Sequence, residues 1–188
     1  MKKYKITLLL FFFCASLFAT ELPLEPSSRE SILSVGGAAG QETFENLKSS
    51  GVLKLNGTTV KHLLEIQGCL IAQAAKLGSI EATGEVNLTN SIISHASTIN
   101  GYLRAQGTTF KSPLTLSLYK AVFTASKILG GITVQRQEAF KGKQVIELKQ
   151  GTVVEGPIVF ESGKGEVHLY PGSKVYSSIE GGKLIRKN

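Results

Sequence analysis

Acidic side chains are the first candidates for chemistry in this sequence, and all 14 of them are Glu, because the chain contains no Asp. Enzymes that cleave polysaccharides commonly work with clustered carboxylates or with a carboxylate-bound cation. Glu65, Glu81 and Glu85 are the acids of the most regular part of the chain. Glu81 and Glu85 flank Gly84, but the alternation of faces along a strand predicts that they do not form a working pair. We therefore expect no catalytic site and no enzyme activity.

Histidines are the second candidates, as possible metal ligands. His62 and His95 each lie eleven residues after the Gly that opens their repeat, and they are two repeats apart. At the parallel-strand spacing of about 4.8 Å this places them about 9.6 Å apart. One metal ion with bonds of about 2.0–2.1 Å to His nitrogens cannot join them. His168 lies between two aliphatic residues of a later strand and is expected to face outward and be exposed. The sequence therefore predicts no metal site and no cofactor.

Cysteine offers little further chemistry. Cys69 is the single cysteine that would remain once an N-terminal leader is removed, so no intramolecular disulfide is expected. It follows Gly68 and precedes an inward Leu70, which predicts an outward or corner position. A partly exposed thiol could pair between molecules, but the sequence places no base beside it to make it a nucleophile. The sequence also contains no Gly-rich phosphate loop, no catalytic-triad spacing and no Cys cluster.

An internal repeat indicates the elements that position these side chains. Four segments align without gaps, GVLKLNGTTV, GCLIAQAAKL, GEVNLTNSII and GYLRAQGTTF, and they start at Gly51, Gly68, Gly84 and Gly101. The columns two, four and nine residues after each Gly are apolar throughout: Leu53, Leu70, Val86, Leu103; Leu55, Ala72, Leu88, Ala105; Val60, Leu77, Ile93, Phe110. Offsets two and four lie on one face of a strand, and offset nine lies beyond a corner.

Two further columns predict the corners of the repeat. One contains Asn56, Gln73, Thr89 and Gln106, and the next contains Gly57, Ala74, Asn90 and Gly107. Gly and Asn tolerate the left-handed backbone that a sharp corner needs. Stacked Asn, Gln and Thr side chains can also hydrogen-bond from one repeat to the next, so we expect a ladder along the first of these columns.

The repeat continues less regularly on both sides. A fifth rung is expected to run through Val122, Thr124, Leu129, Ile132 and Val134, and residues 145–158 then match residues 166–179 at a period of 21. Upstream, TFENLKSSG is expected to form half a rung or a short capping helix. These patterns predict an all-β fold, a single-stranded parallel β-helix (β-solenoid) over residues 41–185. We expect about seven rungs, with a period of about 17 and then 21 residues.

The N-terminal residues have the features of an export signal. Residues 1–19 place Lys2, Lys3 and Lys5 before an apolar run and end in small residues, as in a secretory signal peptide; an uncleaved anchor is the alternative. Residues 20–40 are expected to be a flexible leader. Removing residues 1–19 lowers the formal charge from +7 by three, to +4. The remaining Lys residues are scattered singly, which predicts no nucleic-acid partner, and no stable membrane span is expected after cleavage.

The C-terminal segment GTVVEGPIVFESGKGEVHLYPGSKVYSSIEGG resembles the rungs of bactofilins, which are polymer-forming β-helix proteins. The shared pattern is an aliphatic pair, a Gly-containing corner, a Val, and then Gly with another aliphatic residue. The resemblance covers residues 51–182 in period and two rungs in detail. It implies a rigid rod that associates end to end without nucleotide. Bactofilins are typically cytoplasmic, whereas the export signal places this chain in the periplasm, on the outer surface or in the medium.

These observations predict an exported, non-enzymatic structural or scaffold protein that self-associates through the ends of its helix. The alternative is a glycan-binding or adhesive surface module, with envelope glycan as partner. Its candidate face is the column Thr59, Lys76, Ile92 and Thr109, which offers no aromatic ladder for stacking on sugar rings. A polysaccharide-active enzyme is the least favoured alternative.

Overall fold

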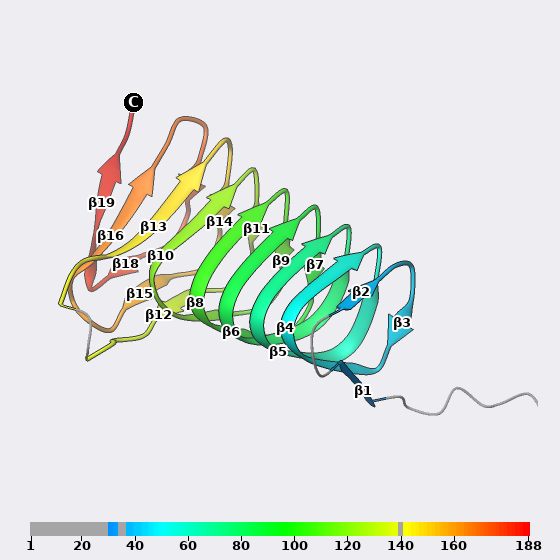
Figure 1. Ribbon diagram of the computed structural model, residues 1–188. Helices are drawn as coiled ribbons and strands as arrows, with labels where there is room; N and C mark the ends of the chain where they lie inside the picture. The colour runs from blue at the N-terminus through cyan, green and yellow to red at the C-terminus, as the bar shows by residue number, and fades with distance from the viewer. Residues whose placement is uncertain (1–29, 34–36, 139–140) are drawn as a thin grey trace, which may run out of the picture.

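The computed structural model describes residues 30–33, 37–138 and 141–188, so the expected signal peptide at 1–19 lies outside the described residues. The described residues form strands and no helix, and their pairings are parallel. The chain winds into a β-solenoid of about nine turns, which confirms the expected fold class. Figure 1 shows the turns stacked one on another, from β1 to β19.

Each turn has three faces, and the longest strands bend around a corner to contribute to more than one face (Figure 1). The strands are β1 (Glu30–Leu33), β2 (Gly37–Ala39), β3 (Thr43–Phe44), β4 (Asn46–Asn56), β5 (Thr59–Gln73), β6 (Lys76–Thr89), β7 (Ile92–Ile93), β8 (Ser97–Gln106), β9 (Thr109–Phe110), β10 (Leu114–Thr124), β11 (Lys127–Ile128), β12 (Ile132–Val134), β13 (Gln144–Lys149), β14 (Val153–Val154), β15 (Ile158–Phe160), β16 (Gly165–Leu169), β17 (Lys174–Val175), β18 (Ile179–Glu180) and β19 (Gly182–Arg186).

The solenoid has more turns than the expected seven, and it begins before residue 41. Strands β1 and β2 lie within residues 20–40, which we expected to be a flexible leader, and both pair with β4. The next stretch forms β3 and the start of β4, so the half rung is correct and the capping helix is wrong. Leu47 is buried there, and Phe44 packs against the core. At the other end, β19 adds a last strand on β16.

The apolar columns form one continuous core. Leu53, Leu70, Val86 and Leu103 pair in register and each is 0% exposed. The columns four and nine residues after each Gly are also buried. Alternation along each strand therefore places every second side chain inside, and full burial of one aliphatic side chain contributes about 1.5–3 kcal/mol. The later repeat of 21 residues is also correct, since Ile146 pairs with Val167 and Ile158 with Ile179.

The glycines at the start of each repeat are required by the stacking itself. Gly68, Gly84 and Gly101 have positive φ values of 137°, 130° and 139°. A Cβ atom on Gly84 would lie 1.9 Å from the carbonyl oxygen of Gly68, and one on Gly101 would lie 2.0 Å from that of Gly84. The other corner is also left-handed, as expected, with φ of 51° at Ala74 and 49° at Asn90.

The hydrogen-bonded ladder lies in a different column from the expected one. Asn56, Gln73, Thr89 and Gln106 pair through their backbones, and Asn56, Gln73 and Gln106 are exposed. Two residues later a buried column, which we call the hydroxyl column, bonds from turn to turn. Its members are Thr58, Ala75, Ser91, Thr108, Ser126 and Thr152. Each hydroxyl from Ser91 onward accepts the backbone N–H of the preceding member and donates to a carbonyl of its own turn.

The fifth rung is shifted from its expected phase. Ile132 and Val134 are buried as expected, but Phe123 and Ile128 occupy the core in place of Thr124 and Leu129. The cause is a β-bulge in β10: Leu118 pairs with Gly101 and Ala121 pairs with Leu103, so Tyr119 and Lys120 together lie opposite Tyr102. One extra residue on a strand reverses which side chains face inward. The ring of Phe123 then packs edge-on against Phe110, with centroids 5.8 Å apart.

Candidate functional site

The three candidate acids do not meet at one site. Glu65 and Glu81 are paired neighbours on one face, whereas Glu85 lies past the Gly84 corner and pairs with Cys69 and Tyr102. Lys48 Nζ lies 2.7 Å from Glu65 Oε1, and Asn87 donates a 2.9 Å hydrogen bond to Glu85. Glu81 and Glu85 are therefore on different faces, because the Gly84 corner lies between them.

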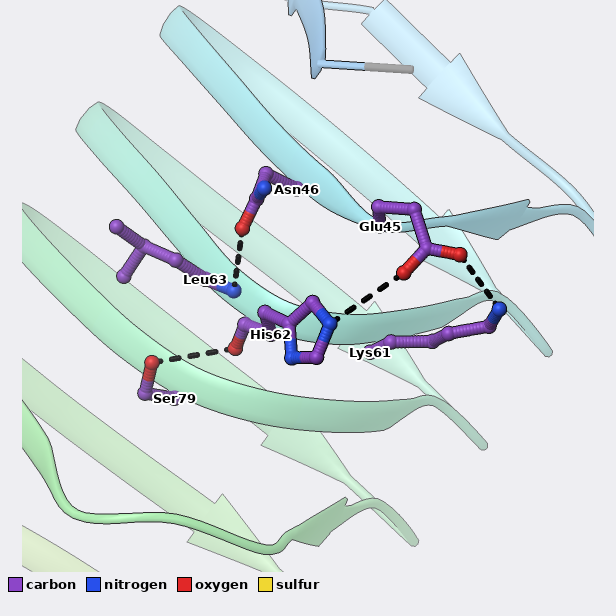
Figure 2. Close-up of polar contacts among 6 residues, drawn as sticks. All are labelled: Glu45, Asn46, Lys61, His62, Leu63 and Ser79. Atoms are coloured by element: carbon purple, nitrogen blue, oxygen red, sulfur yellow. Dashed lines mark hydrogen bonds and ion pairs between the residues drawn. The ribbon is translucent and has the colours of Figure 1, made fainter. Parts of the chain in front are cut away.

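His62 belongs to a surface cluster at a β-bulge of β5, which Figure 2 shows. The carboxylate of Glu45 lies between Lys61 Nζ at 2.5 Å and His62 Nε2 at 3.4 Å. Just beyond, Asn46 Oδ1 accepts the backbone N–H of Leu63 at 3.1 Å, so the bulge is held from the turn before. The side chain of His62 is 67% exposed, which leaves its contact with Glu45 open to solvent screening.

The other two histidines lie in different surroundings. His95 is exposed on the turn two repeats above His62, and its backbone N–H donates to the carbonyl of Gly78, which lies between them. His168 faces outward as expected, but its side chain is only 16% exposed, so the expectation of an exposed histidine is wrong. Its Nε2 lies 3.0 Å from Glu166 Oε2, because side chains two residues apart share a face of β16.

Cys69 is a free thiol at an intermediate depth on the outward face. Burial raises its pKa, and the neighbouring Glu85 carboxylate raises the pKa further. The thiolate is the reactive form of cysteine, so both influences reduce the reactivity of this thiol.

The charge cluster around Glu147 was not predicted from the sequence. Glu147 on β13 has a side chain only 10% exposed, with Lys120 Nζ at 2.9 Å and Lys149 Nζ at 2.8 Å. Burial raises the pKa of Glu147, but the hydrogen bonds from Lys149 and Lys120 outweigh it, and the pKa is lowered. Lys149 Nζ also lies 4.8 Å from the ring centre of Tyr170. The cluster ties three successive turns together.

A second carboxylate on the same face has a similar arrangement. Glu166 on β16 pairs with Lys143 and with His168, and hydrogen bonds from these two side chains lower its pKa. The sequence carries one signal for both clusters, since Glu147 with Lys149 and Glu166 with His168 are each two residues apart on a strand. The cross-turn partners Lys120 and Lys143 depend on the bulge and on a long connection, which the spacing does not reveal.

Hollows of the surface lie away from the expected glycan face. Thr59, Lys76, Ile92 and Thr109 do form one column in register. The hollow of about 350 Å³ beside β5, β6 and β8 is lined by other columns, including Glu65, Gln67, Glu81, Thr83, Thr98 and Asn100. A second groove of about 410 Å³ adjoins it, since Asn100 and Gly101 are consecutive and Gly101 lines the second.

The described residues lack two features, a cluster that could hold a metal ion and a helix that could span a membrane. Within residues 30–33, 37–138 and 141–188, no three His, Cys, Asp or Glu side chains gather where they could hold a metal ion. The same part of the chain contains no helix long and apolar enough to cross a membrane. Comparisons with models of known protein families, with curated proteins and with solved structures found no match.

Proposed function

We propose that the protein is an exported, non-enzymatic scaffold, a rigid β-helical rod that self-associates through the ends of its solenoid. The export part rests on the composition of residues 1–19. The rod part rests on the continuous core and the parallel ladder of the described turns. The end-to-end association is supported by the similarity of the C-terminal rungs to those of bactofilins.

One observation carries the self-association proposal, the partial exposure of core columns at the last described turn. Val154, Ile158 and Val167 are each 0% exposed in the turn before. Their partners Val175 and Ile179 are only partly buried, and Leu184 is 41% exposed. The backbone pairing of β19 is with β16, and a parallel strand offers hydrogen-bonding groups on both edges. A second copy stacked on this turn would continue both the ladder and the core.

The test compares two exposed aliphatic residues at different places on the rod. Light scattering and negative-stain microscopy of the chain from residue 20 are expected to show assemblies larger than a monomer. Leu184→Lys is expected to reduce them to monomers, because it places a charge on the end of the core. Val52→Lys, at a side position that is 50% exposed, is expected to leave assembly unchanged. A wild-type protein that stays monomeric at high concentration overturns the proposal.

The export proposal has its own test. Cell fractionation followed by mass spectrometry of the N-terminus is expected to find the protein outside the cytoplasm and shortened near residue 19. Full-length protein in the cytoplasm would contradict export and leave the rod unaffected.

A further inference from the structure

We infer that the groove beside the Gly84–Gly101 corner is a binding site for a neutral glycan, formed by hexose or N-acetylhexosamine units. This site is independent of the scaffold proposal, since it lies on the side of the rod and not at its end. The groove holds about 410 Å³ and is lined by residues of β6, β8 and β10 and by Gln137: Gly84, Glu85, Gly101, Tyr102, Ser117, Leu118, Tyr119 and Gln137.

The backbone makes the floor of the groove. Stacking forbids a side chain at Gly84 and Gly101, as their contacts with the carbonyl below show. Side chains of the two adjoining faces therefore flank a corner at which Gly84 and Gly101 have no side chain. The column of Asn100 and Ser117 borders one side, and the column of Glu85 and Tyr102 borders the other. The groove therefore lies over the corner at Gly84 and Gly101, and Leu118 occupies the same position in the next turn.

Tyr119, at the bulge of β10, is a second aromatic side chain of this groove. Tyr119 is 54% exposed, and with Lys120 it lies opposite Tyr102. Arg104 steadies Tyr102, because its guanidinium lies 5.9 Å from the ring centre and donates a 3.3 Å hydrogen bond to the phenol oxygen. The sequence offered no aromatic ladder for sugar, but the irregular rung brings two tyrosines to one groove. An aromatic face packs well against the C–H face of a pyranose ring.

The polar groups of the groove suit sugar hydroxyl and acetamide groups. Gln137 Nε2 donates to Ser117 Oγ at 3.1 Å, and the amide oxygen of Gln137 is a hydrogen-bond acceptor. The adjoining hollow adds the amides of Gln67 and Asn100 and the hydroxyl of Thr83. Small numbers of placed hydroxyl, amide and carboxylate groups beside aromatic rings are the usual means of orienting a ligand in a concave site.

Charge decides between neutral and acidic glycans. Glu85 lines the groove, and Glu65 and Glu81 line the adjoining hollow, where Lys48 pairs with Glu65. Neither lining includes a Lys or Arg residue. A uronic-acid or sulfated polymer would place its anions beside these carboxylates, which is unfavourable. A neutral oligosaccharide meets no such repulsion, so it is the occupant that the site favours.

The test measures binding of chitopentaose and cellopentaose to the purified protein by calorimetry, with hexagalacturonate as the acidic probe. Saturable binding of a neutral probe is expected, with Tyr119→Ala and Tyr102→Ala each weakening it roughly tenfold. Tyr176→Ala is the matched control, because Tyr176 is 66% exposed in the last turn, away from the groove. It is expected to leave the affinity unchanged.

Three results of the binding measurements would overturn the inference. These are no saturable binding of either neutral probe, tighter binding of hexagalacturonate, or equal weakening by Tyr176→Ala. Should Tyr102→Ala fail to fold, Tyr102→Phe keeps the ring and is expected to keep the affinity. Backbone amide shifts of Gly84, Gly101 and Ser117 on titration then locate the ligand, and shifts confined to other residues contradict the site. Oligomer mass is a separate readout, so loss of assembly does not bear on this result.

Discussion

Substitutions in the hydroxyl column are expected to change stability in opposite directions at two adjacent turns. Ser91 Oγ accepts the backbone N–H of Ala75 at 3.1 Å and donates to the carbonyl of Thr89 at 2.9 Å, in a buried position. Ser91→Ala leaves that N–H buried without its acceptor, and such a loss costs about 1–3 kcal/mol. One turn earlier the chain has Ala75, so the hydroxyl that would face Thr58 is missing. Ala75→Ser is therefore expected to stabilise the fold by about 0.5–1.5 kcal/mol.

The direct readout is hydrogen exchange of the Ala75 amide, because a solenoid can open in parts and one global unfolding energy would blur the effect. Ser91→Ala is expected to speed that exchange about 5- to 150-fold, which is the factor that corresponds to about 1–3 kcal/mol. Ser177→Ala, at an exposed serine of the last turn, is the control and is expected to change stability by less than about 0.5 kcal/mol. The reasoning is refuted if Ser91→Ala costs no more than this control or if Ala75→Ser destabilises the protein.

Three further outcomes follow from the core, the charge cluster and the thiol. Leu70→Ala is expected to cost about 2–5 kcal/mol in urea unfolding, since Leu70 is 0% exposed. The lowered pKa of Glu147 stabilises the folded state above the ordinary pKa of 4.5, and this stability is lost as the pH falls through the folded pKa. Glu147→Gln is expected to make the free energy of unfolding depend less on pH in this acidic range. Glu85→Gln should speed alkylation of Cys69 modestly, because burial is the larger cause of its raised pKa.

The parts of the fold that could be predicted are those where one side-chain pattern repeats without interruption. Leu53, Leu70, Val86 and Leu103 are spaced by one turn, and burial of such a column needs no other information. Strands β1 and β2 were missed because they lie among Ser, Gly and Ala residues, and their pairing with β4 supplies the order that their composition does not. The hydroxyl column was not predicted because small polar residues usually indicate an exposed corner, whereas here their side chains are buried at one.

The residues of the groove depend on the bulge of β10, one of the places where the repeat is irregular. The bulge of β10 places Tyr119 and Lys120 together opposite Tyr102, where Tyr119 lines the groove and Lys120 reaches Glu147 one turn away. In a regular rung one residue would lie opposite Tyr102, so Tyr119 and Lys120 could not both lie there. Bulges locally disrupt the hydrogen-bonded ladder of a sheet and are commonly retained where they aim a side chain. If the groove binds glycan as inferred, the departure from the period is therefore the feature that distinguishes this solenoid from a plain structural rod.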